Sequence, residues 1–324
     1  EIYTLSLHDA LPISVIGGPW PQPGPVIFRG VKRLLADVID VLADPIDGTP
    51  LERGDSEWLT LKSESGHSYD VARQGYVTLA GGAGLRYSGD DAKMIAARED
   101  FLSGGHYAPF VEAVTGNVQD VLDDANVAEE ANPAILEIGA GTGYYLAHTL
   151  DGVDGARGVG IDVSVPAAKH LAKCHPRVGA VVADAWARLP IRDNSIDAIT
   201  VIFAPRNAEE FARVLKPGGQ VVVLTAATGH LCELRQPLGI IDVERGKVER
   251  MIAQAEGHLA PVGEPELVEF PMTLDQDAIA AQIGMSPSAR HIHADVLAER
   301  IAALPEQMEV TARAYVTRLG KVGE

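Results

Sequence analysis

The stretch that decides the fold is Ile135-Leu136-Glu137-Ile138-Gly139-Ala140-Gly141-Thr142-Gly143, an apolar segment that ends in three alternating glycines. A buried strand that turns sharply into a helix needs glycine there, because glycine adopts positive φ angles and lets a ligand approach the backbone closely. The dinucleotide fingerprint G-x-G-x-x-G requires a glycine at position 144, which is Tyr144. The spacing therefore predicts a nucleotide-like cofactor that is not a dinucleotide.

Further strand patterns follow the glycines, and two of them end in an acid. Residues 158–162 end at Asp162, about twenty residues after the glycines, where α/β folds place a carboxylate for ribose hydroxyls. Residues 178–185 end in Asp184 and Ala185, and the Asp184 carboxylate can accept a hydrogen bond from an adenine amine. Asp162 alone would also suit a helix N-cap, since Pro166 opens a helix. The repeated order of glycine loop, acid and acid favours the cofactor interpretation.

Strands over 195–202 and 220–225 continue the series, with helical patterns between them. Strands that alternate with helices predict a doubly wound α/β fold with a mostly parallel sheet and a ligand crevice at the carboxyl ends of its strands. Residues 267–274 read as a sixth strand, 275–284 as a helical insertion and 307–319 as the last strand.

The loop also matches a known motif. The pattern E-x-G-x-G-x-G, which begins at Glu137, resembles the first motif of S-adenosyl-L-methionine (SAM) methyltransferases. The resemblance implies that Glu137, Gly139 and Gly143 belong to the cofactor-binding set with Asp162, Asp184 and Ala185.

The segment before the glycine loop carries a more specific resemblance. It contains Asp70-Val71-Ala72-Arg73-Gln74-Gly75-Tyr76, Ser88-Gly89-Asp90-Asp91-Ala92-Lys93-Met94 and Phe101-Leu102-Ser103-Gly104-Gly105-His106-Tyr107. With Gly143-Tyr144-Tyr145, Phe203-Ala204-Pro205 and Gly229-His230-Leu231-Cys232, it resembles the large-subunit ribosomal RNA guanine-N1-methyltransferase family, which includes enzymes of resistance to macrolides such as tylosin. The resemblance extends from about residue 38 to the C-terminus.

The family resemblance implies a seven-stranded class I methyltransferase sheet, a ribosomal RNA hairpin as substrate and a homodimer. It also implies that Tyr107, Gly141, Thr142 and His230 touch SAM. Without it, Tyr107 would read as an aromatic plug between a helix and the sheet, and His230 as the neighbour of a helix N-cap. Neither the family nor the sequence names a general base. Asp184 and His230 are both candidates to take the proton from guanine N1, and Phe203 and Pro205 could form an apolar surface for the base.

The chain departs from the family at its N-terminal zinc module. Asp44, Asp47, Ser63 and His67 occupy the positions of the family's zinc ligands. Structural zinc sites depend on thiolates, and here harder or neutral groups replace them, so we expect no zinc. We expect instead a β-hairpin module held by apolar contacts among Leu51, Trp58, Leu59, Leu61, Tyr69 and Val71.

The predicted organisation follows from these patterns. Residues 1–14 resemble the translation of a sequencing adapter and are excluded from the fold, and residues 15–30 are too rich in Pro and Gly to pack. The N-terminal module covers 31–85, a helical connector covers 86–110 and the methyltransferase domain covers 111–324. No apolar run reaches the roughly twenty residues that span a bilayer, so we expect a soluble protein without a membrane partner. The only cysteines, Cys174 and Cys232, are expected to be reduced and unpaired, which suits the cytoplasm.

The formal charge of −18 is the main argument against a nucleic-acid partner. Residues 111–284 carry 13 basic and 25 acidic side chains, so the excess acid gathers in the segment that would bind SAM. A basic face could form elsewhere from Arg73, Arg86, Lys93, Arg98, Arg290, Arg313 and Arg318. Two alternatives to RNA methylation therefore stay open, a small-molecule methyltransferase and a non-catalytic protein that binds SAM or RNA.

Overall fold

The computed structural model describes residues 35–82, 84–87, 89–128, 131–240, 243–286 and 292–323. The two N-terminal segments set aside above, and Arg290 of the predicted basic face, lie outside these residues. Within the described ranges, no helix is both long and apolar enough to cross a membrane.

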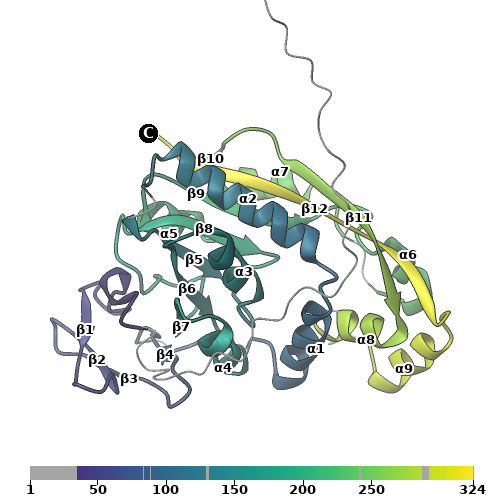
Figure 1. The fold of residues 1–324 in the computed structure, drawn as a ribbon, viewed down its shortest axis with the longest axis horizontal. Helices are drawn as coiled ribbons and strands as arrows, with labels where there is room; N and C mark the ends of the chain where they lie inside the picture. The colour runs from purple at the N-terminus through teal and green to yellow at the C-terminus, as the bar shows by residue number, and fades with distance from the viewer. Residues whose placement is uncertain are drawn as a thin grey trace, which may run out of the picture.

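One large sheet organises the chain (Figure 1). Its strands are parallel from the first edge through the centre, and antiparallel where the C-terminal strand enters. The order across the sheet is β4 (Val77–Thr78), β7 (Val178–Val182), β6 (Arg157–Asp162), β5 (Ala134–Ile138), β8 (Ile196–Ile202), β9 (Leu215–Ala226) and β12 (Gln307–Lys321). On the far side of β12 lie β10 (Leu259–Pro261) and β11 (Glu266–Asp275). The mostly parallel α/β sheet is confirmed, and β4 and β10 add two short strands to the seven expected.

Alternate residues of each central strand enter different cores, as the pleat of a buried strand requires. In β5, Ile135 joins one core, while Leu136 and Ile138 join the other. The first core contains residues of α1 (Ala92–Ser103), α2 (Ala108–Asp124), α3 (Tyr144–Gly152), α4 (Val165–Cys174), α6 (Cys232–Leu238), α8 (Gln276–Gly284) and α9 (Ala294–Ala302). The second contains residues of α5 (Ala208–Val214), α7 (Lys247–Ala255) and the N-terminal module.

The N-terminal module is a three-stranded antiparallel sheet, β1 (Leu51–Arg53), β2 (Thr60–Ser63) and β3 (Ser68–Asp70), preceded by a 3-10 turn, η2 (Ile39–Val41). Its Leu51 and Leu61 are buried in the same core as the sheet of the large domain. Leu59 was expected to help hold the module, but its side chain is 39% exposed, so that expectation was wrong. The strand begins only at Thr60, and Leu59 belongs to the turn before it.

The N-terminal module and the C-terminal helices α8 and α9 lie at opposite ends of the molecule (Figure 1). Figure 1 shows β1, β2 and β3 at one end of the molecule and α8 and α9 at the other, with α4 and α1 between them. The 86–110 region holds α1, and α2 begins within it at Ala108. The helices α1 and α8 pack together, since Gly284 of α8 approaches Ala97 of α1 so closely that an added Cβ would lie 3.0 Å from the alanine Cβ.

Candidate cofactor and substrate site

The glycine loop joins β5 to α3 through three residues of positive φ. Gly139, Gly141 and Gly143 have φ angles of +68°, +56° and +82°. A Cβ at Gly139 would lie 2.6 Å from the Cβ of Ala204, and one at Gly143 would lie 2.5 Å from Sγ of Cys174. Glycine is therefore required for the turn and for packing against the neighbouring segments.

A cavity of about 50 Å³ opens directly above this loop. It brings together Tyr107, Glu137, Gly139, Gly141 and Thr142, all predicted as cofactor-binding residues. Gly143 does not line it, and its place at the N-cap of α3 makes it a turn residue. The lining also includes residues that the sequence did not indicate: Arg98, Leu102, Ala140, Tyr144, Tyr145, Ile202 and Met285.

Two acids lie at the base of the site. Glu137 is buried, and burial raises its pKa well above the usual range. Its Oε2 atom has no hydrogen-bond partner within the described residues. Asp162 at the end of β6 accepts the N–H of Gly141 on Oδ2 at 2.9 Å and that of Ser164 on Oδ1 at 2.8 Å. Burial raises the pKa of Asp162, although these two N–H groups oppose the rise.

The predicted adenine acid lies one strand further along the sheet. Asp184 follows β7 and accepts the backbone N–H of Trp186 at 2.9 Å, while the carbonyl of Ala185 accepts the amide of Asn207 at 3.3 Å. Neither Asp184 nor Ala185 lines the 50 Å³ cavity. Because β7 pairs with β6, this end of the site adjoins Asp162, as an adenine beside a ribose would require.

Tyr107 and His230 come together although 123 positions separate them, but only Tyr107 lines the 50 Å³ cavity. Tyr107 is the N-cap residue of α2 and is buried. His230 precedes α6, and its Nδ1 accepts the backbone N–H of Arg313 at 3.0 Å. The proton of the neutral imidazole is therefore on Nε2, which lies 3.3 Å from the Tyr107 hydroxyl. Burial lowers the pKa of His230 to about 4, so the ring is neutral at pH 7.

An aromatic cluster surrounds this pair. The ring of Phe203 lies 6.1 Å from those of Phe110 and His230 and 6.5 Å from that of Tyr107. Phe203 has a φ of +52°, an unfavourable value for a residue with a Cβ, and its side chain is 43% exposed. Backbone strain of this kind persists where the surroundings hold a residue in a particular place. Phe203 thus presents part of an aromatic face at the mouth of the cavity.

A larger cavity of about 520 Å³ adjoins the first and shares Leu102, Thr142 and Tyr144 with it. Its lining includes Lys169 and Lys173 from α4, and His148 from α3. The two lysines have no ion-pair partner among the described residues. Glu99 and Asp151 also line this cavity, so lysines and acids are mixed next to the glycine loop.

The residues around the smaller cavity fit a SAM molecule. SAM carries an amino-acid end, a ribose and an adenine. Glu137 Oε2 and the Tyr145 hydroxyl are buried without hydrogen-bond partners in the described structure, so the cavity offers polar atoms for a polar ligand. Gly139 and Gly141, which have positive φ angles and no side chain, let such a ligand approach the backbone.

Of the four residues expected at the family's zinc-ligand positions, Asp44, Ser63 and His67 form a hydrogen-bonded group, whereas Asp47 accepts hydrogen bonds from Thr49. Asp44 is fully buried and accepts the backbone N–H of Ile46 at 2.8 Å, Nδ1 of His67 at 2.8 Å and the hydroxyl of Tyr69 at 2.9 Å. The Ser63 hydroxyl accepts the N–H of His67 at 3.0 Å. Ligand atoms of Asp44, Asp47 and His67 lie within 4.8 Å of one another. The absence of thiolates and the occupied oxygens of Asp44 do not fit structural zinc.

Comparison with known proteins places the chain in a family. Residues 135–219 match the model of a methyltransferase domain. The 23S rRNA (guanine(748)-N1)-methyltransferase of Streptomyces fradiae is 38% identical over 275 residues, 85% of this chain and 95% of the relative. A protein of Micromonospora griseorubida, assigned to the 23S rRNA (guanine-N1)-methyltransferases, is 40% identical over 290 residues, 87% of this chain and 98% of the relative.

Among solved structures, a SAM-dependent methyltransferase from Thiobacillus denitrificans in complex with S-adenosyl-L-homocysteine aligns with a TM-score of 0.40. Its identity to this chain is 16%, and the alignment covers 64% of this chain and 91% of that one. The two relatives at 38% and 40% identity, each matched over nearly its whole length, decide the assignment. The chain is a methyltransferase and belongs to the 23S rRNA (guanine-N1)-methyltransferase family.

Proposed function

We propose that this protein transfers a methyl group from SAM to N1 of a guanine in a hairpin of large-subunit ribosomal RNA. The similarity to the Streptomyces fradiae enzyme over 95% of its length carries the proposal, because it includes the segments outside the methyltransferase sheet. The cytoplasm, where ribosomes are made, is the proposed location. A homodimer, which the resemblance implies, stays a prediction.

The site supports this reaction through positioning. Methyl transfer from a sulfonium needs the nucleophile in line with the methyl carbon, and alignment supplies much of the rate enhancement. A guanine leaves its stack to enter such a site, and aromatic faces stabilise an unstacked base. Phe203 offers such a face beside Tyr107 and Phe110. These rings therefore form the proposed platform for the acceptor base.

The proton on guanine N1 must leave as the methyl group arrives. The contacts of His230 argue against it as the base, because Nδ1 accepts an N–H and Nε2 carries the proton. Burial raises the pKa of Tyr107, so its hydroxyl stays protonated. Asp184 does not line the cavity. We therefore assign the Tyr107–His230 pair to orientation, and the proton passes to water or to a group of the RNA complex.

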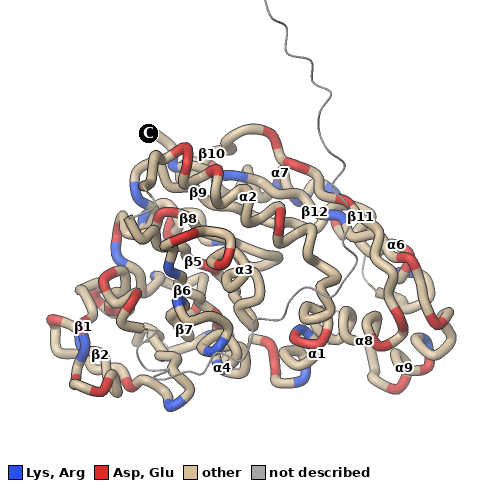
Figure 2. The backbone as a smooth tube through the Cα atoms, in the orientation of Figure 1, with Lys and Arg blue, Asp and Glu red and all other residues tan. Residues whose placement is uncertain are grey.

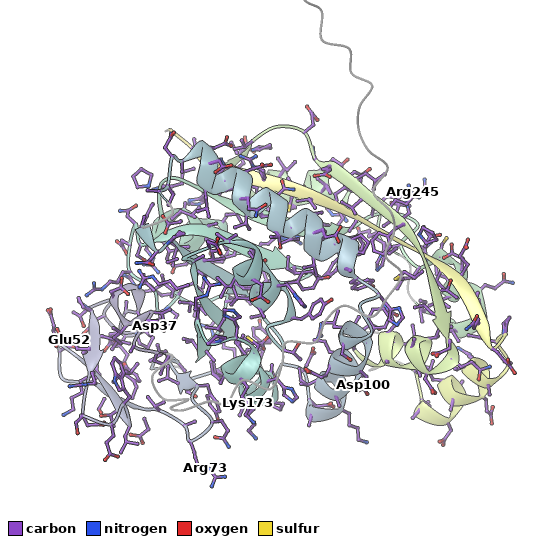
Figure 3. All side chains as sticks on the ribbon, viewed as in Figure 1. Asp37, Glu52, Arg73, Asp100, Lys173 and Arg245 are labelled. Carbon is purple, nitrogen blue, oxygen red and sulfur yellow. The ribbon has the colours of Figure 1, made fainter. Side chains whose placement is uncertain are left out.

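The proposed RNA-facing surface lies around α4 and the N-terminal module. Figure 3 places Arg73 of the module and Lys173 of α4 along the same edge of the molecule, and Arg245 far from both. Lys and Arg residues are interspersed with Asp and Glu in this region rather than gathered in one stripe (Figure 2). The charge pattern supports a few phosphate contacts rather than a broad basic face.

We further propose that the N-terminal module folds without zinc. The buried carboxylate of Asp44 gathers three donors, and hydrogen bonds to a charged group are stronger than neutral ones. These bonds join the 44–47 turn to β3, the connection that a metal would otherwise make. The module would then depend on hydrogen bonds and on its apolar contacts with the large domain.

Primer extension on large-subunit RNA tests the function, since a methyl group on guanine N1 blocks base pairing and stops reverse transcriptase. RNA from cells with and without the gene is compared, beginning at the guanine that is named for the Streptomyces fradiae relative, 748. We expect a stop that depends on the gene and that a Gly139→Ala variant fails to restore. An unchanged pattern, with SAM binding intact, would point to a small-molecule acceptor instead.

A further inference from the structure

We propose that Arg98 binds the carboxylate of SAM, so that the methionine end of the cofactor is held between this guanidinium and Glu137. The inference rests on the assignment of the chain to the methyltransferases and does not depend on which RNA or other acceptor is methylated. Arg98 comes from α1, outside the glycine loop and the sheet.

Arg98 lies directly on the glycine loop. A Cβ at Gly141 would lie 3.3 Å from Cδ of Arg98, so the aliphatic stem of the arginine covers the bare backbone there. The guanidinium lines the same cavity as Glu137 and Tyr145. Its Nε is buried and has no hydrogen-bond partner among the described residues. An unpaired buried donor of a charged group costs free energy, and an anion in the cavity would satisfy it.

The present partners of Arg98 leave it able to bind such an anion. Nη2 donates to Oδ2 of Asp90 at 2.6 Å and to the carbonyl of Met285 at 3.2 Å. Both contacts use one nitrogen, and the side chain of Arg98 remains 28% exposed. A guanidinium has five N–H donors, which suit a carboxylate in a two-point arrangement. Nε thus remains available as a donor for a carboxylate while Nη2 keeps its contacts.

An acidic group that can receive the ammonium of an amino acid lines the same cavity. Glu137 presents a buried Oε2 with no partner in the described chain. An α-amino acid carries an ammonium and a carboxylate on one carbon, so a site for it needs an acid and a base that share one small space. Arg98 and Glu137 line the same cavity of about 50 Å³. This pairing selects a zwitterion over a simple anion such as phosphate.

The contacts of Arg98 also connect the proposed carboxylate site to two helices. Met285 is the C-cap residue of α8, and Asp90 immediately precedes the N-cap of α1, Asp91. Arg98 therefore links the proposed carboxylate site to the end of α8 and to the start of α1.

Binding of two cofactor fragments tests this assignment without any measurement of methyl transfer. S-adenosyl-L-homocysteine has the carboxylate, whereas 5′-methylthioadenosine has the same adenosine and sulfur but no amino-acid group. Titration calorimetry with the full chain gives the ratio of the two dissociation constants. For Arg98→Met, which keeps the stem over Gly141, we expect S-adenosyl-L-homocysteine to bind at least about ten-fold more weakly and methylthioadenosine to bind unchanged, because charge-assisted hydrogen bonds are lost only with the first ligand.

Asp90→Asn is the matched control. It removes the ion pair of Arg98 but leaves the guanidinium in place, so we expect the preference for S-adenosyl-L-homocysteine to remain. If Arg98 only holds α1 in position, Arg98→Met will weaken the binding of S-adenosyl-L-homocysteine and of methylthioadenosine equally. Alternatively, Arg98→Met and Asp90→Asn will both lose the preference for S-adenosyl-L-homocysteine. Either result would overturn the assignment, as would an unchanged ratio in Arg98→Met. Arg98→Lys, which keeps the charge, provides a second reading should the methionine variant fold poorly, and it should retain part of the preference.

Discussion

The hydroxyl of Tyr107 lies 3.3 Å from Nε2 of His230, and Nδ1 of the same imidazole accepts the backbone N–H of Arg313 at 3.0 Å. The pair joins the start of α2 to the segment before α6 and to β12. Because both nitrogens of the ring are engaged, the orientation of His230 is set by the fold rather than by a ligand.

The burial of His230 predicts a pH dependence of stability. Burial lowers its pKa in the folded state to about 4, below the 6.5 of an unperturbed histidine. Between these values the unfolded chain binds more protons, so the stability contributed by the neutral ring is present above pH 6.5 and is lost as the pH falls toward 4. Each unit of difference between the two pKa values corresponds to about 1.4 kcal/mol of unfolding free energy. The contribution of His230 to stability is therefore at most about 3 kcal/mol.

His230→Gln isolates this effect, since an amide can accept the Arg313 N–H and donate to Tyr107 without titrating. The free energy of unfolding of both proteins, measured in urea from pH 4.5 to 7, should converge as the pH falls. Parallel curves would show that the pKa of His230 is not lowered on folding.

We expect one methyl group added at Gly139 to lower both stability and cofactor binding. Gly139→Ala adds a Cβ 2.6 Å from that of Ala204 at a φ of +68°, and overpacking with an unfavourable φ costs about 1 to 3 kcal/mol. The change also pushes the Phe203-Ala204-Pro205 segment away from the loop. We expect a lower melting temperature and loss of S-adenosyl-L-homocysteine binding by calorimetry.

Gly116→Ala is the matched control, because Gly116 lies within α2 and a Cβ there meets no atom within 4 Å. It should raise the stability by up to about 1 kcal/mol and leave cofactor binding unchanged. Equal behaviour of the two variants would remove the argument that the glycine loop is specifically shaped for a ligand.

We expect Lys169 and Lys173 of α4 to contribute to RNA affinity in a way that depends on salt concentration. The double variant Lys169→Ala/Lys173→Ala should bind an RNA hairpin more weakly, and the slope of log affinity against log salt should fall by about 1.5. Arg245→Ala is the control, because Arg245 lies far from Lys173 (Figure 3) and its loss should leave the slope unchanged. A double variant with the wild-type slope would show that the RNA does not contact α4.

Because the carboxylate of Asp44 is occupied by hydrogen bonds, we expect the purified protein to contain no structural zinc. Metal analysis of the purified chain should find far less than one zinc per molecule, and a chelator should leave its melting temperature unchanged. The triple variant Asp44→Cys/Asp47→Cys/Ser63→Cys, which keeps His67, should instead acquire about one zinc per chain, because three thiolates and an imidazole make a structural zinc site. Stoichiometric zinc in the unaltered protein would contradict the hydrogen-bonded arrangement of Asp44.

Much of the fold could be predicted from local sequence. The strands of the central sheet have short apolar runs bounded by Gly or Asp, and β5, β6 and β8 appear within one residue of their predicted limits. The glycine spacing identified the loop because only glycine fits its φ angles. Among the glycines, however, Gly143 packs against Cys174 and does not line the cavity, a difference that depends on α4 and cannot be read from the motif.

The rest of the site depends on contacts between distant segments. Arg98 looked like one of many exposed charges, and only the packing of α1 on α8 puts it over Gly141. The module showed the same limit, since the sequence named its apolar residues but did not indicate that Asp44 would be buried beneath His67 and Tyr69. Such relations come from tertiary structure and leave no periodic pattern in the chain.

The measurement that tests the central claim most directly is nucleoside mass spectrometry of large-subunit ribosomal RNA incubated with the purified protein and isotopically labelled SAM. We predict labelled 1-methylguanosine with the unaltered protein and none with Gly139→Ala. Label in another nucleoside, or unlabelled RNA from a protein that binds S-adenosyl-L-homocysteine, would contradict the assignment of guanine N1 as the acceptor.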